Sequence, residues 1–220
     1  MPKVTQEYKE QMRARILEAA VKAAETRPAY ELTMRDVIRS TGLSPGAVYS
    51  YYRNIDDLWI DFFNSVSRDM QAEPDTARRG GEPLGEYIDR LMGLLARSLR
   101  EISQPVGKII FELDTKRAAH PEFAKKRAEN VSLLLFYHGA LEQLEQAALA
   151  DIRAGLLPED TDVETVLLFL QTSFDGILRD MILERCYGLK KTAPVDETRL
   201  TAALAVSLRA LLHIRDDETA

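Results

Sequence analysis

Residues 33 to 53 gather hydroxyl, phenol and guanidinium groups, which are suited to hydrogen bonding, onto two short predicted helices. The segment Thr33-Met34-Arg35-Asp36 has the Thr-x-x-Asp pattern of a capping box, which predicts a helix from Met34 to about Ser40. Thr41-Gly42-Leu43 follows as a tight turn. Ser44-Pro45 then begins a second helix, with serine as the N-cap and proline in the first helical position. A helix, a three-residue turn and a second helix have the spacing of a helix-turn-helix.

The second short helix carries few large apolar side chains. Its side away from the core offers Ser44, Gly46, Ala47 and Ser50 with two long hydrogen-bonding arms, Tyr49 and Tyr51, while Val48 and Tyr52 supply the apolar stripe. Small residues at a helix N-terminus allow the backbone to approach a phosphate, whose charge the first amides favour. The alternative is a plain corner between two helices that binds no ligand, since capping boxes are common.

These residues resemble the tetracycline-repressor (TetR) family of transcriptional regulators. The resemblance is carried by Gly42-Leu43-Ser44-Pro45-Gly46-Ala47-Val48-Tyr49-Ser50-Tyr51-Tyr52-Arg53-Asn54, followed by Asp56-Asp57-Leu58. Together with Ile16 to Ala20 and Leu32 to Val37 upstream, it covers roughly residues 10 to 66.

The resemblance implies a role for each matching residue. Positions that hold the phosphate backbone in the family are occupied here by Thr33, Ser44, Tyr49 and Arg53. Positions that approach base edges are occupied by Arg35, Pro45, Gly46, Ala47, Ser50 and Tyr51. The family further implies a homodimeric repressor that binds a double-stranded, palindromic operator and is released from it by a small-molecule effector.

Three positions depart from the family pattern. Ile38 and Thr41 replace residues that are usually alanine, which predicts altered packing between the two short helices. Ile55 stands where the family usually has lysine, so we expect one phosphate contact fewer per subunit.

Helical periodicity runs along nearly the whole chain, and no convincing period-2 run appears, so we expect an all-α fold. Helices are expected at about 5–26, 58–70, 84–102, 105–116, 121–154, 162–187 and 196–214. A Pro- and Gly-containing loop at 73–83 marks a boundary. The expected organisation is a three-helix DNA-binding domain over 1–56, a connecting helix and loop over 57–82, and an effector-binding and dimerisation domain over 83–220.

The last two expected helices carry broad apolar stripes. They consist of Val163, Val166, Leu167, Leu170, Phe174, Ile177, Leu178 and Met181 on one helix, and Leu200, Leu204, Ser207, Leu208, Leu211 and Leu212 on the other. Two such helices suit a four-helix interface between two copies of the chain. The alternative is that both stripes are buried within a monomer.

Aromatic and methionine side chains of the same region could line an apolar effector pocket. The candidates are Met92, Phe111, Phe136, Tyr137, Phe169 and Phe174. The alternative is that they are ordinary core residues.

Composition narrows the function class. The 220 residues are 45% hydrophobic and 29% charged, with a net charge of -6 divided between +1 over residues 1–60 and -7 over the rest. A single cysteine excludes a disulfide framework and favours a reducing compartment. No apolar run approaches the ~20 residues of a membrane span, and the first ten residues do not resemble a signal peptide, so we expect a cytoplasmic protein that does not enter a membrane.

Motifs of catalysis and of metal or cofactor binding are missing from the sequence. There is no phosphate loop, no Gly-x-Ser-x-Gly, no His-Glu-x-x-His and no His-carboxylate cluster at metal spacing. We therefore expect a regulator that is not an enzyme and has no cofactor. Two alternatives stay open: a ligand-independent DNA-binding or interaction protein, and a helical enzyme that carries a helix-turn-helix.

Overall fold

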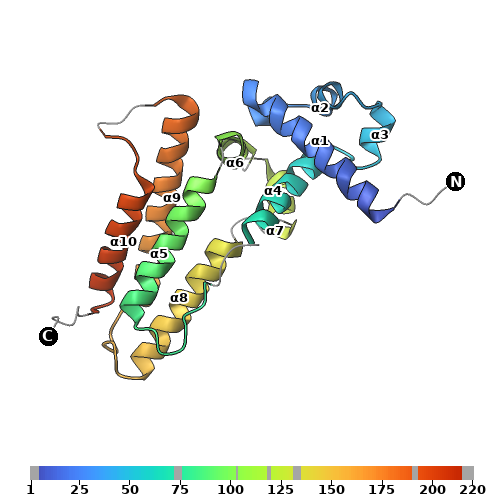
Figure 1. Ribbon diagram of the computed structural model, residues 1–220. Coiled ribbons are helices and arrows are strands. Elements are labelled where there is room, and N and C mark those ends of the chain that lie inside the picture. Colours follow the sequence, from blue (N-terminus) through green and yellow to red (C-terminus); the bar gives the residue numbers. More distant parts are fainter. Residues whose placement is uncertain are drawn as a thin grey trace. The chain divides into compact units, whose positions relative to one another are not determined.

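The structure of the chain is a computed structural model, which describes residues 5–71, 76–102, 104–117, 120–130, 135–189 and 193–214. Across these residues the regular structure is helical and no strand occurs, so the predicted all-α fold is confirmed (Figure 1). The helices pack as two compact units. Unit 1 comprises the described residues of Met1–Arg68 and Ser103–Leu133, and unit 2 those of Asp69–Ile102 and Leu134–Ala220.

Unit 1 is built on a long first helix against which shorter helices pack. Its elements are α1 (Gln6–Thr26), the 3-10 helix η1 (Ala29–Glu31), α2 (Met34–Thr41), α3 (Pro45–Tyr49), most of α4 (Ile55–Gln71), α6 (Gln104–Arg117) and α7 (Pro121–Asn130). Helix α1 packs against α2 and α6, and α6 also contacts η1. The sequence-based division placed residues 103–133 in the carboxyl-terminal domain, whereas their helices pack with the amino-terminal ones.

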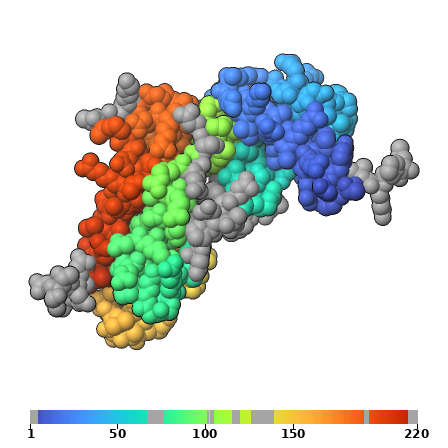
Figure 2. Space-filling model, in the orientation of Figure 1, coloured from blue at the N-terminus to red at the C-terminus, as the bar shows by residue number. Residues whose placement is uncertain are grey.

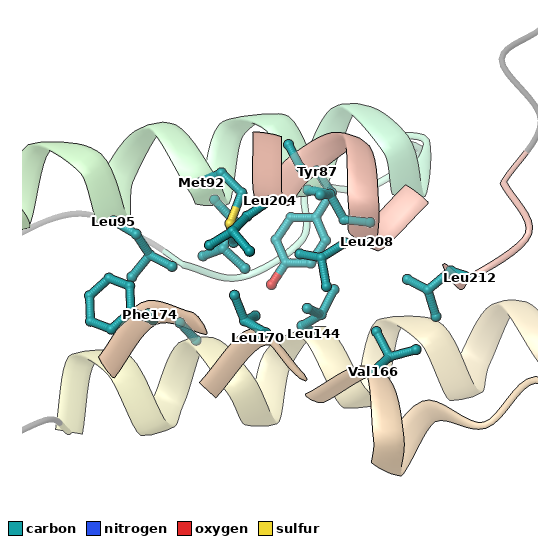
Figure 3. Close-up of a cluster of buried hydrophobic side chains, with 14 of the residues drawn as sticks. Tyr87, Met92, Leu95, Leu144, Val166, Leu170, Phe174, Leu204, Leu208 and Leu212 are labelled. Carbon is teal, nitrogen blue, oxygen red and sulfur yellow. The ribbon is translucent and has the colours of Figure 1, made fainter. Parts of the chain in front are cut away.

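Unit 2 is a bundle of long helices around one apolar core. Its elements are α5 (Leu84–Glu101), α8 (Leu135–Arg153), α9 (Val163–Tyr187) and α10 (Glu197–Leu211). Helix α5 lies beside α10 and also contacts α8, and α9 contacts both α8 and α10. Figure 3 shows side chains from all four helices meeting in the core, with Tyr87 from α5, Leu144 from α8, Leu170 from α9 and Leu208 from α10.

The broad apolar stripe of α9 lies mostly inside this core. Val163, Val166, Leu170, Phe174, Ile177 and Met181 are each at most 8% exposed, and Leu204, Leu208 and Leu212 of the last stripe are buried as well. The stripe predicted as a dimer interface is therefore largely the interior of one subunit. These two helices also carry exposed apolar side chains. Leu168, Phe169 and Val206 lie outside the predicted stripes, whereas Leu200 and Leu211 belong to the stripe of the last helix.

The segment 121–154, expected to be one helix, is helical over α7 (Pro121–Asn130) and α8 (Leu135–Arg153), and residues 131–134 lie outside the described part of the chain. The two helical stretches belong to different units. Among the described residues, no helix is both long enough and apolar enough to cross a membrane.

Candidate nucleic-acid interface

The turn between α2 and α3 is set by local hydrogen bonds that the sequence predicts. The Thr33 hydroxyl accepts from the Asp36 amide at 3.4 Å, and the Asp36 carboxylate accepts from the Thr33 amide at 3.0 Å, which completes the capping box. Gly42 ends α2 in the left-handed region at φ 67°. Ser44 caps α3 by accepting from the Ala47 amide at 3.3 Å, with Pro45 as the first helical residue.

Thr41 organises the turn. Its buried hydroxyl donates to the Ile38 carbonyl at 2.8 Å and accepts from the Leu43 amide at 3.1 Å. The Arg15 side chain of α1 donates to the Thr41 carbonyl at 3.1 Å. Alanine has no hydroxyl and cannot make the first two bonds, so Thr41 adds hydrogen bonds where the family usually has a methyl group.

Two side chains one turn apart fasten α3 to the core. Val48 is fully buried and Tyr52 is 2% exposed. The Tyr52 hydroxyl donates to the Asp61 carboxylate of α4 at 2.6 Å, and Arg13 of α1 donates to the same carboxylate at 3.0 Å. Burial raises the pKa of the Tyr52 phenol, and the hydrogen bond to Asp61 raises it further, so Tyr52 stays a neutral donor.

The other face of α3 is open to solvent. Of the ten predicted DNA-contacting residues, Ala47 and Tyr51 are half-buried, and the rest are exposed: Thr33, Arg35, Ser44, Pro45, Gly46, Tyr49, Ser50 and Arg53. The structure thus brings them together along α2, α3 and the residues that follow. Their contacts with bases or phosphates stay a prediction.

Gly46 leaves a gap on this face. A Cβ atom at Gly46 would meet no atom of the chain within 4 Å, and the backbone φ lies outside the region that requires glycine. Nothing inside the described chain therefore demands a glycine here. Close approach of another molecule does give a reason for it.

Electrostatics divide the arginines of this region into two groups. Arg27 pairs with Asp36 at 2.9 Å. The Thr33 hydroxyl and amide, with Arg27, lower the pKa of Asp36 to about 2, so this carboxylate stays ionised. Arg35, Arg39 and Arg53 are exposed and form no ion pair with any described residue, which leaves their guanidinium groups available to an anionic partner.

Ile55 is the first residue of α4 and is half-buried. The helix start is capped by Asn54, whose side-chain oxygen accepts from the Asp57 amide at 2.9 Å. Asp56 and Asp57 add negative charge in the first turn. The start of α4 thus carries two acidic residues and lacks the lysine that the family usually has at position 55.

Three of the six predicted effector residues have described side chains in unit 2, and these three differ in exposure. Met92 and Phe174 lie in the core of unit 2 at 1% and 5% exposure (Figure 3). Phe169 of α9 is 36% exposed. Phe111 is half-buried on α6 of unit 1. The side chains of Phe136 and Tyr137 lie outside the described part of the chain. The pocket assignment thus stays a prediction.

Unit 2 has a groove elsewhere, with a volume of about 1060 Å³. It is bordered by the start of α5, the connection between α8 and α9, and the chain after α10, including Arg78, Asp151, Leu156 and His213. Arg78 and Asp151 pair within it at 2.6 Å. None of the four predicted effector residues with described side chains lines this groove.

Side chains outside the helix-turn-helix hold it in place, and the sequence does not predict them. Asp61 accepts hydrogen bonds from both Tyr52 and Arg13, and Arg15 donates to the Thr41 carbonyl at the end of α2. Arg13 and Asp61 are separated by 48 residues, and Arg15 and Thr41 by 26. No spacing pattern marks such pairs, because only the fold brings them together.

Known proteins similar to this chain are regulators. Residues 16–61 match the family model described as "Bacterial regulatory proteins, tetR family". A Bacillus subtilis (strain 168) protein, the uncharacterized HTH-type transcriptional regulator YfiR, is 30% identical over 191 residues, which cover 82% of this chain and 85% of that protein. The HTH-type transcriptional regulator TtgR of Pseudomonas putida is 26% identical over 187 residues, covering 83% of this chain and 86% of TtgR.

Among solved structures, Salmonella enterica GusR has a similar fold. It superposes with a TM-score of 0.64 at 19% identity, and the match covers 96% of this chain and 99% of the GusR chain. The likeness therefore extends beyond the helix-turn-helix to the arrangement of the remaining helices.

Proposed function

The chain belongs to the TetR family of transcriptional regulators, and from this premise we propose that it is a cytoplasmic, homodimeric repressor that leaves a palindromic operator when a small molecule binds. The observation that carries the proposal is the divided surface of α3. Val48 and the following Tyr52 are buried, while Ser44, Pro45, Gly46 and Tyr49 face solvent. A helix held by two residues and otherwise open is suited to lie in a DNA groove.

The proposed contacts follow the two roles of the exposed residues. Thr33, Ser44, Tyr49 and Arg53 hold phosphates, and Arg35, Pro45, Gly46, Ala47, Ser50 and Tyr51 approach base edges. The Ser44 hydroxyl acts as the acceptor in its cap, so its proton is available to a phosphate oxygen. Each subunit places α3 in the major groove, with half-sites roughly 34–36 Å apart or a multiple of that distance.

Dimerisation is assigned to the exposed faces of α9 and α10. Leu168 and Val206 are 58% and 60% exposed, and the two helices run side by side on unit 2 (Figure 2). Burying such side chains between two copies is favourable. A dimer also doubles the contact with a palindrome, which matters for a chain with a net charge of -6.

Effector binding is assigned to unit 2. The volume of the groove, about 1060 Å³, is comparable to that of the larger small-molecule sites. The groove is therefore a second candidate location beside the predicted pocket residues. A ligand that binds one conformation better shifts the population toward it, and release follows if that conformation separates the two recognition helices.

Selection from random genomic fragments tests the DNA-binding proposal. Wild-type protein should enrich fragments that share one palindrome, whereas enrichment of no common sequence contradicts the proposal. Metabolites that raise the melting temperature are then tested for release of the enriched fragment. A ligand-independent DNA-binding protein gives no releasing compound, and an enzyme converts its ligand, which mass spectrometry of the compound detects.

Trp59 provides a spectroscopic test of the coupling between ligand and DNA. It is the one tryptophan of the chain, lies fully buried on α4, and its indole N–H has no hydrogen-bond partner among the described residues. We propose that movement of α4 carries the effect of the ligand to the DNA-binding helices. A compound that releases the enriched fragment should therefore change the Trp59 emission. A releasing compound that leaves the emission unchanged argues against a route through α4, and the Trp59→Phe variant supplies the background.

A further inference from the structure

The end of α1 and the start of η1 meet at Arg27 and Pro28. Helix α1 has no basic residue in its last turn and ends at Arg27 in an extended conformation. Pro28, which precedes η1, makes no side-chain cap. The Thr26 hydroxyl donates to the Ala23 carbonyl, whereas the Ala24 and Arg27 carbonyls and the Ala29 amide, the first of η1, take side-chain partners from elsewhere in the fold.

Two residues of α6 supply both partners. The Lys108 ammonium donates to the Ala24 carbonyl at 2.7 Å and to the Arg27 carbonyl at 3.2 Å. The Glu112 carboxylate accepts from the Ala29 amide at 2.6 Å through one oxygen and pairs with Lys108 at 3.1 Å through the other. The Lys108–Glu112 ion pair thus caps both the end of α1 and the start of η1.

The Lys108–Glu112 pair is largely buried. The Glu112 and Lys108 side chains are 5% and 17% exposed, and Ala24 and Ala29 are at most 1% exposed. A buried ion pair is a weak source of net stability, since removing its charges from water offsets most of the attraction. Each bond, however, requires its carbonyl or amide at one place, so the pair specifies the path of the chain between α1 and η1.

The path of this connection leads directly to the DNA-binding helices. Arg27 pairs with Asp36 in the first turn of α2, and η1 is followed within two residues by Thr33, the N-cap of α2. Helix α6 itself begins at Gln104, two residues after the chain leaves unit 2 at Ile102.

We propose that Lys108 and Glu112 are positioning residues for DNA binding: from α6 they hold the α1–η1 connection, and with it α2 and α3, in the orientation that operator recognition requires. The inference rests on the proposed DNA-binding function. It gives α6 a role in orienting the helix-turn-helix, although Lys108 and Glu112 are far from that motif in the sequence.

The test uses the full chain and a fluorescently labelled duplex that carries the palindrome enriched by wild-type protein. Lys108→Met and Glu112→Ala should each weaken binding to this duplex by about tenfold, while binding to a scrambled duplex changes little. The two substitutions alter net charge in opposite directions, so a shared loss cannot come from charge alone. Lys125→Met and Glu122→Ala make the same charge changes at exposed sites of α7 and should bind like wild type.

Two further readouts separate positioning from general destabilisation. Glu112→Gln keeps an oxygen acceptor for the Ala29 amide and should retain most of the affinity. The Ala29 amide proton should resonate downfield in the wild type and in Glu112→Gln, but not in Glu112→Ala. Binding is measured at a temperature where circular dichroism finds each variant folded.

The outcomes distinguish the two proposals. Failure of wild-type protein to enrich any sequence overturns the DNA-binding function. If the wild-type protein binds the palindrome and Lys108→Met and Glu112→Ala bind it with the same affinity, the positioning role is overturned. So does an affinity loss that only follows the unfolded fraction, or one that Glu112→Gln fails to rescue.

Discussion

At the level of single residues, the exposed face of α3 is notable for what it lacks. Gly46 has open space around it, and the neighbouring Pro45 and Ala47 are small or compact. The described chain does not need this space for its own packing. Its value lies in letting the backbone of α3 come close to DNA, so stability and binding should respond differently when the space is filled.

Gly46→Ala tests this separation. Alanine favours the helix by roughly 0.5–1 kcal/mol over glycine, so the melting temperature should stay the same or rise. The added methyl group should nevertheless weaken operator binding, because it stands between α3 and the groove. Gly93→Ala, at an open position of α5, is the matched control and should leave DNA affinity unchanged. Equal operator affinity for Gly46→Ala and wild type contradicts the proposed approach of α3 to DNA.

Ile55 is the residue-level departure with the clearest electrostatic consequence. Ile55→Lys restores the usual family cation at the start of α4 and should tighten binding to all sequences alike. The dependence of affinity on salt should steepen by about 0.9 per added phosphate contact. Leu149→Lys makes the same charge change at a residue of unit 2 that is 38% exposed and lies outside the groove. Affinity and salt slope that match this control contradict a phosphate contact at position 55.

At the level of elements, α2 depends on its capping box for both stability and pH response. The bound Asp36 has a pKa of about 2, below its ordinary value of 3.8. A lowered folded-state pKa adds stability above pH 3.8, and this contribution is lost as the pH falls toward 2.

Asp36→Asn should therefore cost about 1 kcal/mol at pH 7, and the difference from wild type should shrink toward pH 2. Urea unfolding followed by Trp59 emission measures this, because Trp59 lies in the same unit. Thr33→Ser keeps a hydroxyl at the cap and should keep the wild-type pH dependence. A difference between Asp36→Asn and wild type that stays constant with pH contradicts this account of the box.

At the level of the whole molecule, the proposed dimer interface is the exposed apolar surface of α9 and α10. Val206→Glu and Leu168→Glu place a charge on exposed apolar positions of these helices, and each should convert the dimer to a species near 24.8 kDa in light scattering. Leu149→Glu, at an exposed leucine of α8 outside both helices, should remain dimeric. Retention of the dimer by both interface variants places the interface elsewhere.

Charge also acts on the whole molecule. Residues 1–60 carry a net charge of +1 and the remainder -7, so the acidic charge that opposes DNA binding lies outside the helix-turn-helix region. Nonspecific binding should be weak and sensitive to salt, and discrimination should come from base edges and from the spacing of the two recognition helices.

The sequence by itself determined the features that depend on neighbouring residues. The Thr33–Asp36 box, the left-handed Gly42 and the Ser44 cap are bonds or conformations within a few residues, so spacing alone predicts them. The all-α class follows from periodicity, and the family resemblance follows from the residues of one short segment. The roles of individual DNA-contacting residues remain predictions from that resemblance.

Only the tertiary structure decided which helices pack together and which faces they bury. Glu112 reaches Ala29 across 83 residues, and Arg13 reaches Asp61 across 48, distances at which no sequence pattern records a pairing. Helix α9 is apolar around so much of its circumference that periodicity cannot distinguish core from interface, and packing against α8 and α10 makes that choice. Local hydrogen bonds follow from residue spacing, whereas long-range contacts exist only once the chain has folded.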